Sequence, residues 1–322
     1  MNEFENQICD LIDGNQCQLG PIVQELWSGY GVIQKAVIDG QPVIIKAIDA
    51  AEIKPNRRGW KSDFAHLRKV RSYDVETVFY QKYSLRCGTL CRVAKLLGSE
   101  SERDRHSWLL ILEDLDSSGF GRRESDLSDD DIESCLTWLA NFHATFIGVS
   151  GRDGLWPTGT YWHLGTRPDE FRAMSSGPLK DIAIELDFKL NGAKYQTLVH
   201  GDAKVANFCF GDKAKTVAAV DFQYVGAGVG IKDVAYFVSS CLDELQAEQR
   251  EGEILNYYFR QLRDAIQRNQ SALDADAIEK EWRKLYPIAW ADFCRFLQGW
   301  SPGHWKLNGY SKRMTEIAIG KV

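Results

Sequence analysis

Short apolar runs separated by turn residues characterise the first part of the chain. Residues 24–48 contain three such runs, and the last two, VIQKAVI and PVIIKAI, are rich in β-branched residues. Asp39-Gly40 lies between them and is a preferred pair for the type I′ turn of a two-residue hairpin. The bend Ser28-Gly29-Tyr30-Gly31 precedes them. The pattern predicts an antiparallel meander of three short strands with a glycine loop at its first turn.

The segment that follows has mixed signals. Residues 51–71 are basic and polar, which favours a loop with some helix, whereas residues 73–83 have apolar positions at helical spacing. Leu109–Leu112 is an apolar strand that an acidic stretch ends. Residues 117–125 are polar, contain two glycines and are the best candidate for a hinge.

Helical periodicity dominates the rest of the chain. Ser128 and Asp131 form a capping-box pattern, and an apolar stripe over residues 129–147 ends at Gly148. Residues 151–195 have weak periodicity and are interpreted as an insertion. From Ile231 onward the pattern predicts helices over 231–249, 250–268, 273–284 and 286–299.

These elements together predict an α+β, bilobal architecture. A small antiparallel β-sheet lobe would occupy residues 1–115, and a larger, mostly helical lobe would occupy residues 116–322. A chain of 322 residues is long enough for two lobes, each with a sizeable core.

Composition and charge narrow the classes of function. The net charge of -6 offers no basic surface, so we expect no nucleic-acid partner. No apolar run approaches the ~18 residues of a membrane span. The N-terminus, MNEFENQICD, is acidic and polar, unlike a secretory signal. These features predict a cytoplasmic protein that does not insert into a membrane.

The cysteines point to a reduced protein. There are eight of them, none in a CxxC pair, and Cys87 and Cys91 have no matching Cys or His pair elsewhere. In a long chain without an export signal, reduced and mostly buried thiols are expected, and a zinc site is not.

Three polar residues stand beside apolar runs in residues 198–223, LVHGDAKVANFCFGDKAKTVAAVDFQ. Asp202 lies on the loop after the first run, Asn207 precedes the second and Asp221 ends the third. A turn at Gly211-Asp212 would pair the second and third runs as a hairpin. Asn207 and Asp221 are therefore expected to lie close together, with Asp202 on the loop that leads in.

This set suits phosphoryl transfer. Mg²⁺ takes oxygen ligands, one or two from the protein and others from phosphates, and Asn207 and Asp221 would supply the protein ligands. Asp202 would then be free to orient a hydroxyl and accept its proton.

A cation on the nucleotide phosphates is also required. Lys46 ends the buried run VIIK and is the candidate, and Glu76 on the following helix is its natural partner. Backbone N–H groups of the loop 28–32 would cover the phosphates.

In this order, His200-Gly201-Asp202, Asn207 and Asp221-Phe222-Gln223 resemble the catalytic core of the aminoglycoside phosphotransferase and choline kinase group, small-molecule relatives of protein kinases. The motif VDFQ, followed by the sequence DVAYFVSS, is most similar to the ecdysteroid kinase-like and choline kinase-like branch. The resemblance spans residues 25–245 and implies a protein-kinase-like fold that uses ATP and Mg²⁺.

The resemblance implies a role for each matching position. Asp202 corresponds to the catalytic base, and Asn207 and Asp221 to the magnesium ligands. Lys46 corresponds to the lysine that contacts the α- and β-phosphates, with Glu76 as its ion-pair partner.

Further positions carry over in the same way. The glycine loop, Ser28 to Gly31, would bind the nucleotide, and Glu113 and Leu115 fall on the adenine-binding edge. Asp233 matches a buried aspartate that braces the catalytic loop.

Two departures from protein kinases bear on the substrate. Lys204 lies two residues after Asp202, where kinases acting on Ser or Thr place a lysine against the transferred phosphate, so we hypothesise the same contact. Gln223 replaces the glycine of the Asp-Phe-Gly triplet, and the gap before Asp233 is short. An activation loop has little room, which argues against a protein substrate.

Each polar residue taken alone is as often a cap or turn residue as a catalyst, and His143 is interpreted as a satisfied core histidine. Taken together, the ordered set favours an ATP-dependent phosphotransferase acting on the hydroxyl of a small molecule. A kinase-fold ligand-binding protein or pseudokinase is the alternative, and a protein kinase is the third possibility.

The acceptor pocket is expected in the helical lobe. Trp290, Asp292 and Trp300 are the candidates to line it, although most aromatic residues there belong to the core. An aromatic cage with an acid would suit an amine or a quaternary ammonium group, and the same aromatics could hold an apolar alcohol. The sequence leaves both acceptors open and indicates no oligomeric state.

Overall fold

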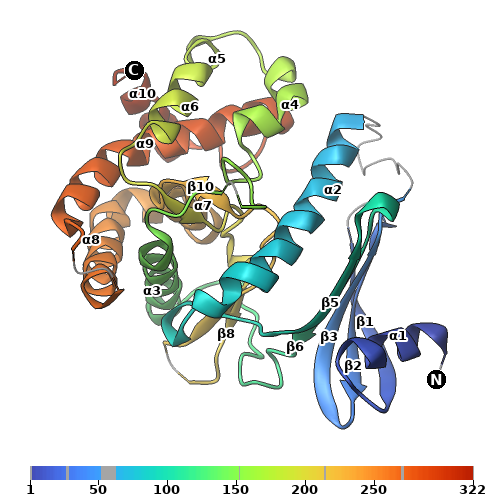
Figure 1. Cartoon of the computed structure of the whole chain (residues 1–322). Coiled ribbons are helices and arrows are strands. Elements are labelled where there is room, and N and C mark those ends of the chain that lie inside the picture. Colours follow the sequence, from blue (N-terminus) through green and yellow to red (C-terminus); the bar gives the residue numbers. More distant parts are fainter. Residues whose placement is uncertain are drawn as a thin grey trace.

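The structure, a computed structural model, has the predicted α+β fold, with an antiparallel sheet in the N-terminal part and mostly helices in the C-terminal part (Figure 1). It describes residues 2–26, 29–51, 63–151, 153–213, 215–269 and 272–321. The division of the lobes at residue 115 stays a prediction.

Five strands form one antiparallel sheet in the order β1-β2-β3-β6-β5. They are β1 (Cys17–Glu25), β2 (Gly31–Ile38), β3 (Gln41–Asp49), β5 (Leu96–Glu102) and β6 (Ser107–Glu113). The β2–β3 hairpin turns at Asp39 and Gly40, whose φ angles of 48° and 81° are those of a type I′ turn. The meander is confirmed, although its first strand begins at Cys17 rather than near residue 24.

The alternation of side chains along β3 decides which residues reach the site. Val43 and Ile45 face α1 (Glu3–Leu11) and form a buried cluster with it. Because successive side chains of a strand point to opposite faces, Lys46 projects toward α2 (Asp63–Val78), which crosses the other side of the sheet (Figure 1).

A π-helical stretch, Phe79–Tyr83, continues α2. The helix predicted for residues 73–83 is therefore the end of a longer helical element that begins at Asp63. Phe79 stacks on Phe222 with ring centroids 3.9 Å apart and an interplanar angle of 13°. This contact joins the helix beside the sheet to the residue that follows Asp221.

Helices and two small sheets build the rest of the molecule. The helices are α3 (Asp129–Phe146), α4 (Pro168–Ala173), α5 (Pro178–Asp181), α6 (Ala183–Asn191), α7 (Ile231–Cys241), α8 (Glu244–Asn269), α9 (Ala275–Trp300) and α10 (Gly309–Ile319). The short strands are β4 (Arg92–Val93), β7 (Thr197–Val199), β8 (Phe208–Phe210), β9 (Val217–Ala219) and β10 (Gly226–Gly228), ordered β4-β9-β8 and β10-β7. The predicted insertion, residues 151–195, contains α4, α5 and α6.

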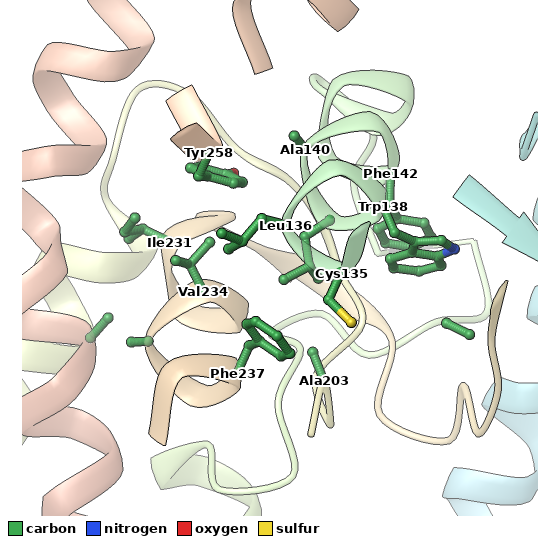
Figure 2. Close-up of a cluster of buried hydrophobic side chains, with 14 of the residues drawn as sticks. Cys135, Leu136, Trp138, Ala140, Phe142, Ala203, Ile231, Val234, Phe237 and Tyr258 are labelled. Atoms are coloured by element: carbon green, nitrogen blue, oxygen red, sulfur yellow. The ribbon is translucent and has the colours of Figure 1, made fainter. Parts of the chain in front are cut away.

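The main core extends through the helical part of the molecule and includes the place where α3 meets α7. Leu136 of α3 faces Val234 and Phe237 of α7, and Ala203, on the loop after β7, belongs to the same buried cluster (Figure 2). The capping box predicted at the start of α3 is confirmed, because Ser128 accepts a hydrogen bond from the backbone of Asp131. This core fixes the loop that carries Asp202.

Of the helix boundaries predicted from residue 231 onward, the start at Ile231 and the ends at residues 268 and 299 are correct to within one residue, and the internal boundaries were wrong. α7 ends at Cys241, α8 continues past residue 249, α9 continues through Pro287, and α10 was not predicted. A proline inside a helix costs about 3 kcal/mol. Every residue from 285 to 297 is buried, so packing on both sides of the proline offsets that cost.

Two general expectations from the sequence can also be compared with the structure. Among the residues that the structure describes, none of the helices combines the length and the apolar character needed to cross a membrane. Six of the eight cysteines are buried, as predicted.

Candidate active site

The loop between β7 and β8 is held by buried hydrogen bonds. Asp233, fully buried in the first turn of α7, accepts hydrogen bonds from the backbone N–H groups of His200, at 2.6 Å, and Gly201, at 3.0 Å. The ring of His143 lies between Asp233, at 3.1 Å, and the hydroxyl of Tyr258, at 2.8 Å. Asp233 thus makes the bracing contacts predicted for it, and His143 is a satisfied core histidine.

The His-Gly-Asp motif has a local structural reason for each residue. The backbone N–H of Asp202 donates to Nδ1 of His200 at 3.2 Å, so Nε2 carries the proton and donates to the carbonyl of Val220 at 3.0 Å. Gly201 has φ of 81°, and a Cβ there would lie 2.1 Å from the carbonyl oxygen of Tyr224. The motif therefore binds the loop of Asp202 to the strand end of Asp221.

Asp202, Lys204 and Asn207 form one connected group. The side-chain amide nitrogen of Asn207 donates to the backbone carbonyl of Asp202 at 2.7 Å and to its Oδ2 at 3.1 Å. Lys204 Nζ lies 2.9 Å from the same carboxylate oxygen. Because its nitrogen is committed to Asp202, Asn207 has its amide oxygen left for a cation.

Asp221 has an oxygen that is suited to a metal ion. Its backbone is left-handed, with φ of 69°. Its buried Oδ1 has no hydrogen-bond partner among the described residues and lies 3.8 Å from Nζ of Lys46. Burial raises its pKa, but the charges of Lys46, Lys69 and Lys204 outweigh burial and hold the pKa below its ordinary value. An ionised carboxylate with an unpaired oxygen, beside the amide oxygen of Asn207, fits Mg²⁺.

The expected ion pair on the other side of the site is present. Lys46 Nζ lies 2.6 Å from Oε2 of Glu76, and both side chains are buried. Burial alone would lower the pKa of Lys46, but the carboxylates of Glu76 and Asp221 raise it above its ordinary value. Lys46 is therefore a fixed cation.

A cavity of about 440 Å³ lies between the sheet and this loop. Its lining includes Lys46, Glu76, Asn207, Asp221, Glu113 and Leu115. The carboxylate of Glu113 accepts a hydrogen bond from Arg92 at 2.6 Å, and its backbone N–H donates to the carbonyl of Lys95 at 2.9 Å. Lys204 lines it as well, so seven of the predicted site residues surround one cavity.

The glycine loop does not reach this cavity within its described part. Ser28 lies outside the described residues, and Gly29, Tyr30 and Gly31 are not in the lining. The hydroxyl of Tyr30, a buried residue, lies 3.0 Å from Nδ1 of His66, and Gly31 packs so closely on β3 that a Cβ would lie 2.0 Å from a backbone oxygen. These residues support the sheet, and the flanking Leu26 and Ile33 line the cavity instead.

A second cavity, of about 430 Å³, adjoins the first. Lys69, Lys204, Asp221 and Gln223 line both cavities, whereas Asp202 lines only the second. These four shared residues mark the junction of the two cavities, and Asp202 lies on the side of the second cavity.

Of the three acceptor candidates, only Trp300 lines this second cavity. Asp292 is fully buried, where it pairs with Arg295 at 2.8 Å and lies 3.6 Å from Lys232. Trp290 is buried against Tyr310. Neither residue can contact a ligand in the cavity, because each faces the protein interior.

The second cavity contains functional candidates that the sequence did not single out. They are Arg68 and Lys69 of α2, Tyr161, Arg167, Tyr224, Tyr236 and Lys306. Lys69 precedes Glu76 by two helical turns on the same face, so helical spacing could have found it. Lys306 lies between helices in a segment without periodicity, and no sequence signal points to it.

Comparison with known proteins supports the resemblance to small-molecule kinases that the sequence motifs indicated. The model of the ecdysteroid kinase-like family matches residues 179–271, which include the loop of Asp202 and the start of α7. No curated protein sequence matches the chain.

Solved structures match over almost the whole length. A candidate aminoglycoside phosphotransferase from Ralstonia eutropha JMP134 superposes with a TM-score of 0.56 at 15% identity, covering 98% of this chain and 94% of that one. A microcompartment-associated aminopropanol kinase superposes with a TM-score of 0.50 at 15% identity, with the same two coverages. The predicted resemblance is therefore confirmed for the fold and, in sequence, for residues 179–271.

Proposed function

We propose that this protein is an ATP-dependent phosphotransferase that transfers the γ-phosphoryl group to a hydroxyl of a small molecule. The observation that carries the proposal is the convergence of Asp202, Asn207, Asp221 and Lys46 at the junction of two cavities. The cavity against the sheet suits the nucleotide, and the cavity that Asp202 lines suits the acceptor.

The residues of the first cavity would bind the nucleotide. Asn207 and Asp221 would hold Mg²⁺, which when bound neutralises charge on the phosphates. Lys46, held by Glu76, would contact the phosphates, and the backbone near Glu113 and Leu115 would meet the base.

Asp202 then acts on the acceptor. It orients the hydroxyl and accepts its proton, while the hydroxyl oxygen forms a bond to the γ-phosphorus. The bond from that phosphorus to the β–γ bridging oxygen breaks, which leaves ADP and the phosphorylated acceptor. Lys204, 2.9 Å from Asp202, would contact the phosphoryl group during its transfer and stabilise its negative charge.

A small acceptor is favoured over a peptide. The chain between Asp221 and α7 is committed to the fold, because Phe222 is buried and β10 pairs with β7. An activation segment of the protein-kinase kind has no room there. The family model and the two solved structures support a small-molecule kinase, and a cytoplasmic location stays a prediction.

The test is ADP formation from ATP and Mg²⁺ with a panel of hydroxyl acceptors that spans sugars, amino alcohols, aminoglycosides, sterols and hydroxy acids. Asp202→Asn should lower turnover by about 10²- to 10⁴-fold while nucleotide affinity is kept. Asp212→Asn, on the exposed hairpin turn nearby, is the matched control and should leave turnover unchanged. Failure to bind ATP, or full activity of Asp202→Asn, would refute the proposal.

A further inference from the structure

The acceptor cavity has more basic than acidic groups in its lining. The basic residues are Arg68, Lys69, Arg167, Lys204 and Lys306. The only carboxylates that line it, among the described residues, are Asp202 and Asp221. Asp202 already pairs with Lys204, and Asp221 faces Lys46. Glu170, a buried carboxylate outside the lining, pairs with Arg167 and also attracts Arg68. The five basic groups still outnumber these three carboxylates, so the protein neutralises only part of the positive charge.

Two guanidinium groups meet at one side of this cavity. Arg68 donates to the carbonyl of Thr166 at 2.9 Å, and Arg167 donates to the carbonyl of Tyr161 at 2.5 Å and pairs with Glu170 at 3.1 Å. Within the described residues, no carboxylate lies within 4.0 Å of Arg68. Burial, and then the charge of Arg167, lower the pKa of Arg68. Two neighbouring like charges repel each other unless an anion offsets them.

Lys306 adds a third charge. Its ammonium group lies 4.9 Å from the ring centre of Tyr236 and 5.6 Å from that of Phe293, and it donates to the hydroxyl of Ser239 at 3.2 Å. It has no carboxylate within 4.0 Å in the part of the chain that the structure describes. Burial lowers its pKa to about 8. A partly desolvated cation without a counter-ion is costly, so a ligand anion would stabilise it.

Tyr224 responds to the same positive field. Burial raises the pKa of its hydroxyl, but the charges of Arg167, Lys69 and Arg68 outweigh burial and lower the pKa below its ordinary value. The three cations act together on the hydroxyl oxygen of Tyr224, so their fields overlap on this side of the cavity, where an anionic group of a ligand would gain from them.

We infer that the acceptor is an anion: an alcohol on an apolar or aromatic frame that carries an oxyanion group such as a carboxylate. Its oxyanion lies at Arg68 and Arg167, its frame lies against Tyr161, Phe296 and Trp300, and its hydroxyl lies at Asp202. Guanidinium groups match oxyanions through paired, charge-assisted hydrogen bonds. The inference rests on the proposed function, because it assigns this cavity to the acceptor. It disfavours the amine that the aromatic residues alone suggested.

Three ligands that share the same ring and hydroxyl group isolate the effect of ligand charge on affinity. They are 4-(hydroxymethyl)benzoate, 4-(hydroxymethyl)benzamide and 4-(hydroxymethyl)benzylamine, with charges of about -1, 0 and +1 at pH 7. Calorimetric titration of the full chain without nucleotide should show the benzoate binding at least about tenfold more tightly than the amide. The amine should bind most weakly.

Substitutions show which residues cause the preference for the benzoate. Arg68→Gln should abolish the preference for the benzoate, whereas Arg68→Lys, which keeps the charge, should retain part of it. Arg260→Gln removes an exposed arginine of α8 and is the control for net charge; it should bind like the original protein. Thermal unfolding of each variant checks that it folds.

Equal binding of the three ligands, binding of none, or a preference for the amine would overturn the inference. A benzoate preference that survives combined substitution, Arg68→Gln with Arg167→Gln, would overturn it as well. Because nucleotide is absent from the titration, the outcome is separate from the proposed function. A benzoate preference in a protein that never turns over ATP would refute the phosphotransferase and leave the anion site standing.

Discussion

The two cavities that meet at Asp221 differ in how their charges are balanced. In the cavity against the sheet, Lys46 pairs with Glu76 at 2.6 Å and Lys35 pairs with Asp116 at 2.8 Å. In the adjoining cavity, Arg68 and Lys306 have no such partner within the described residues. Internal pairs hold cations in a set position before a ligand arrives, whereas unpaired cations leave their charge for the ligand. Most cations of the first cavity are thus held by pairs within the protein, whereas the anion that we propose would balance the unpaired cations of the second.

The largest expected effect comes from breaking the buried pair of the first cavity. Lys46→Met leaves the carboxylate of Glu76 buried without a partner, so the free energy of unfolding should fall by about 3–5 kcal/mol. Lys46→Met with Glu76→Leu should recover most of that loss, because the uncompensated charge is gone. Urea denaturation measures both variants.

Lys35→Met is the control, since its partner Asp116 is more exposed, and it should cost less than about 1 kcal/mol. An unchanged free energy of unfolding in Lys46→Met would show that the first cavity does not depend on its internal pair. Nucleotide affinity should fall in both variants that lack Lys46.

The next effect concerns the junction of the cavities. Lys204 lines both, and a charge-assisted hydrogen bond to the transferred phosphate is worth about 1.5–3 kcal/mol. Lys204→Ala should therefore lower turnover about ten- to a hundredfold. Lys213→Ala, on the exposed turn after β8, is the control in the same ADP assay. Near-normal turnover of Lys204→Ala would remove Lys204 from the catalytic set.

The smallest effect is a pH dependence confined to the second cavity. Because burial lowers the pKa of Lys306 to about 8, the cation is lost as pH rises through that value. Affinity for the benzoate should then fall severalfold, whereas affinity for the neutral amide should not change. In Lys306→Gln this pH step should disappear, and a step that persists unchanged would exclude Lys306 as its source.

Other titratable groups near Lys306 can be told apart from it as the source of a pH step. Asp202, Lys204, Cys241 and His304 act on it electrostatically. Burial lowers the pKa of His304 and raises that of Cys241 to about 12, so neither changes charge near pH 8. Tyr224 also lies in the cavity with a lowered pKa, and any step that it causes would survive Lys306→Gln.

The lowered pKa of Lys306 also makes the free energy of unfolding depend on pH. Between about 8 and its ordinary value of 10.5, the unfolded chain binds the proton and the folded chain does not. Stability depends on pH through the difference in bound protons. The contribution of Lys306 to the free energy of unfolding therefore rises with pH across this window.

Local signals made much of the fold and of the catalytic loop predictable. The Asp39-Gly40 turn, the capping box at Ser128 and the order of Asp202, Asn207 and Asp221 depend on residues near one another in the chain. The hairpin of β8 and β9 then brings Asn207 and Asp221 together by short connections. Only the pair of Lys46 and Glu76 joins residues of two different elements, a strand and a helix. The sequence pattern predicted each of these two elements.

The second cavity was hidden because remote segments build it. Its walls come from α2, the segment before α4, α7 and the end of α9. The acceptor candidates were on the correct helix, but Trp290 and Asp292 were on the wrong faces. Phe293, Phe296, Leu297 and Trp300 line the cavity at helical spacing. Because every residue from 285 to 297 is buried, no amphipathic pattern distinguished that face from the others.

Helix α2 contributes to both cavities through residues only two turns apart. Glu76 holds the cation of the first, and Lys69 and Arg68 line the second. An α-helix transmits displacement along its axis because each turn is hydrogen-bonded to the next. A shift of α2 at Glu76 on binding of the proposed nucleotide would therefore move Arg68 as well. By thermodynamic reciprocity, the factor by which nucleotide changes acceptor affinity equals the factor by which acceptor changes nucleotide affinity.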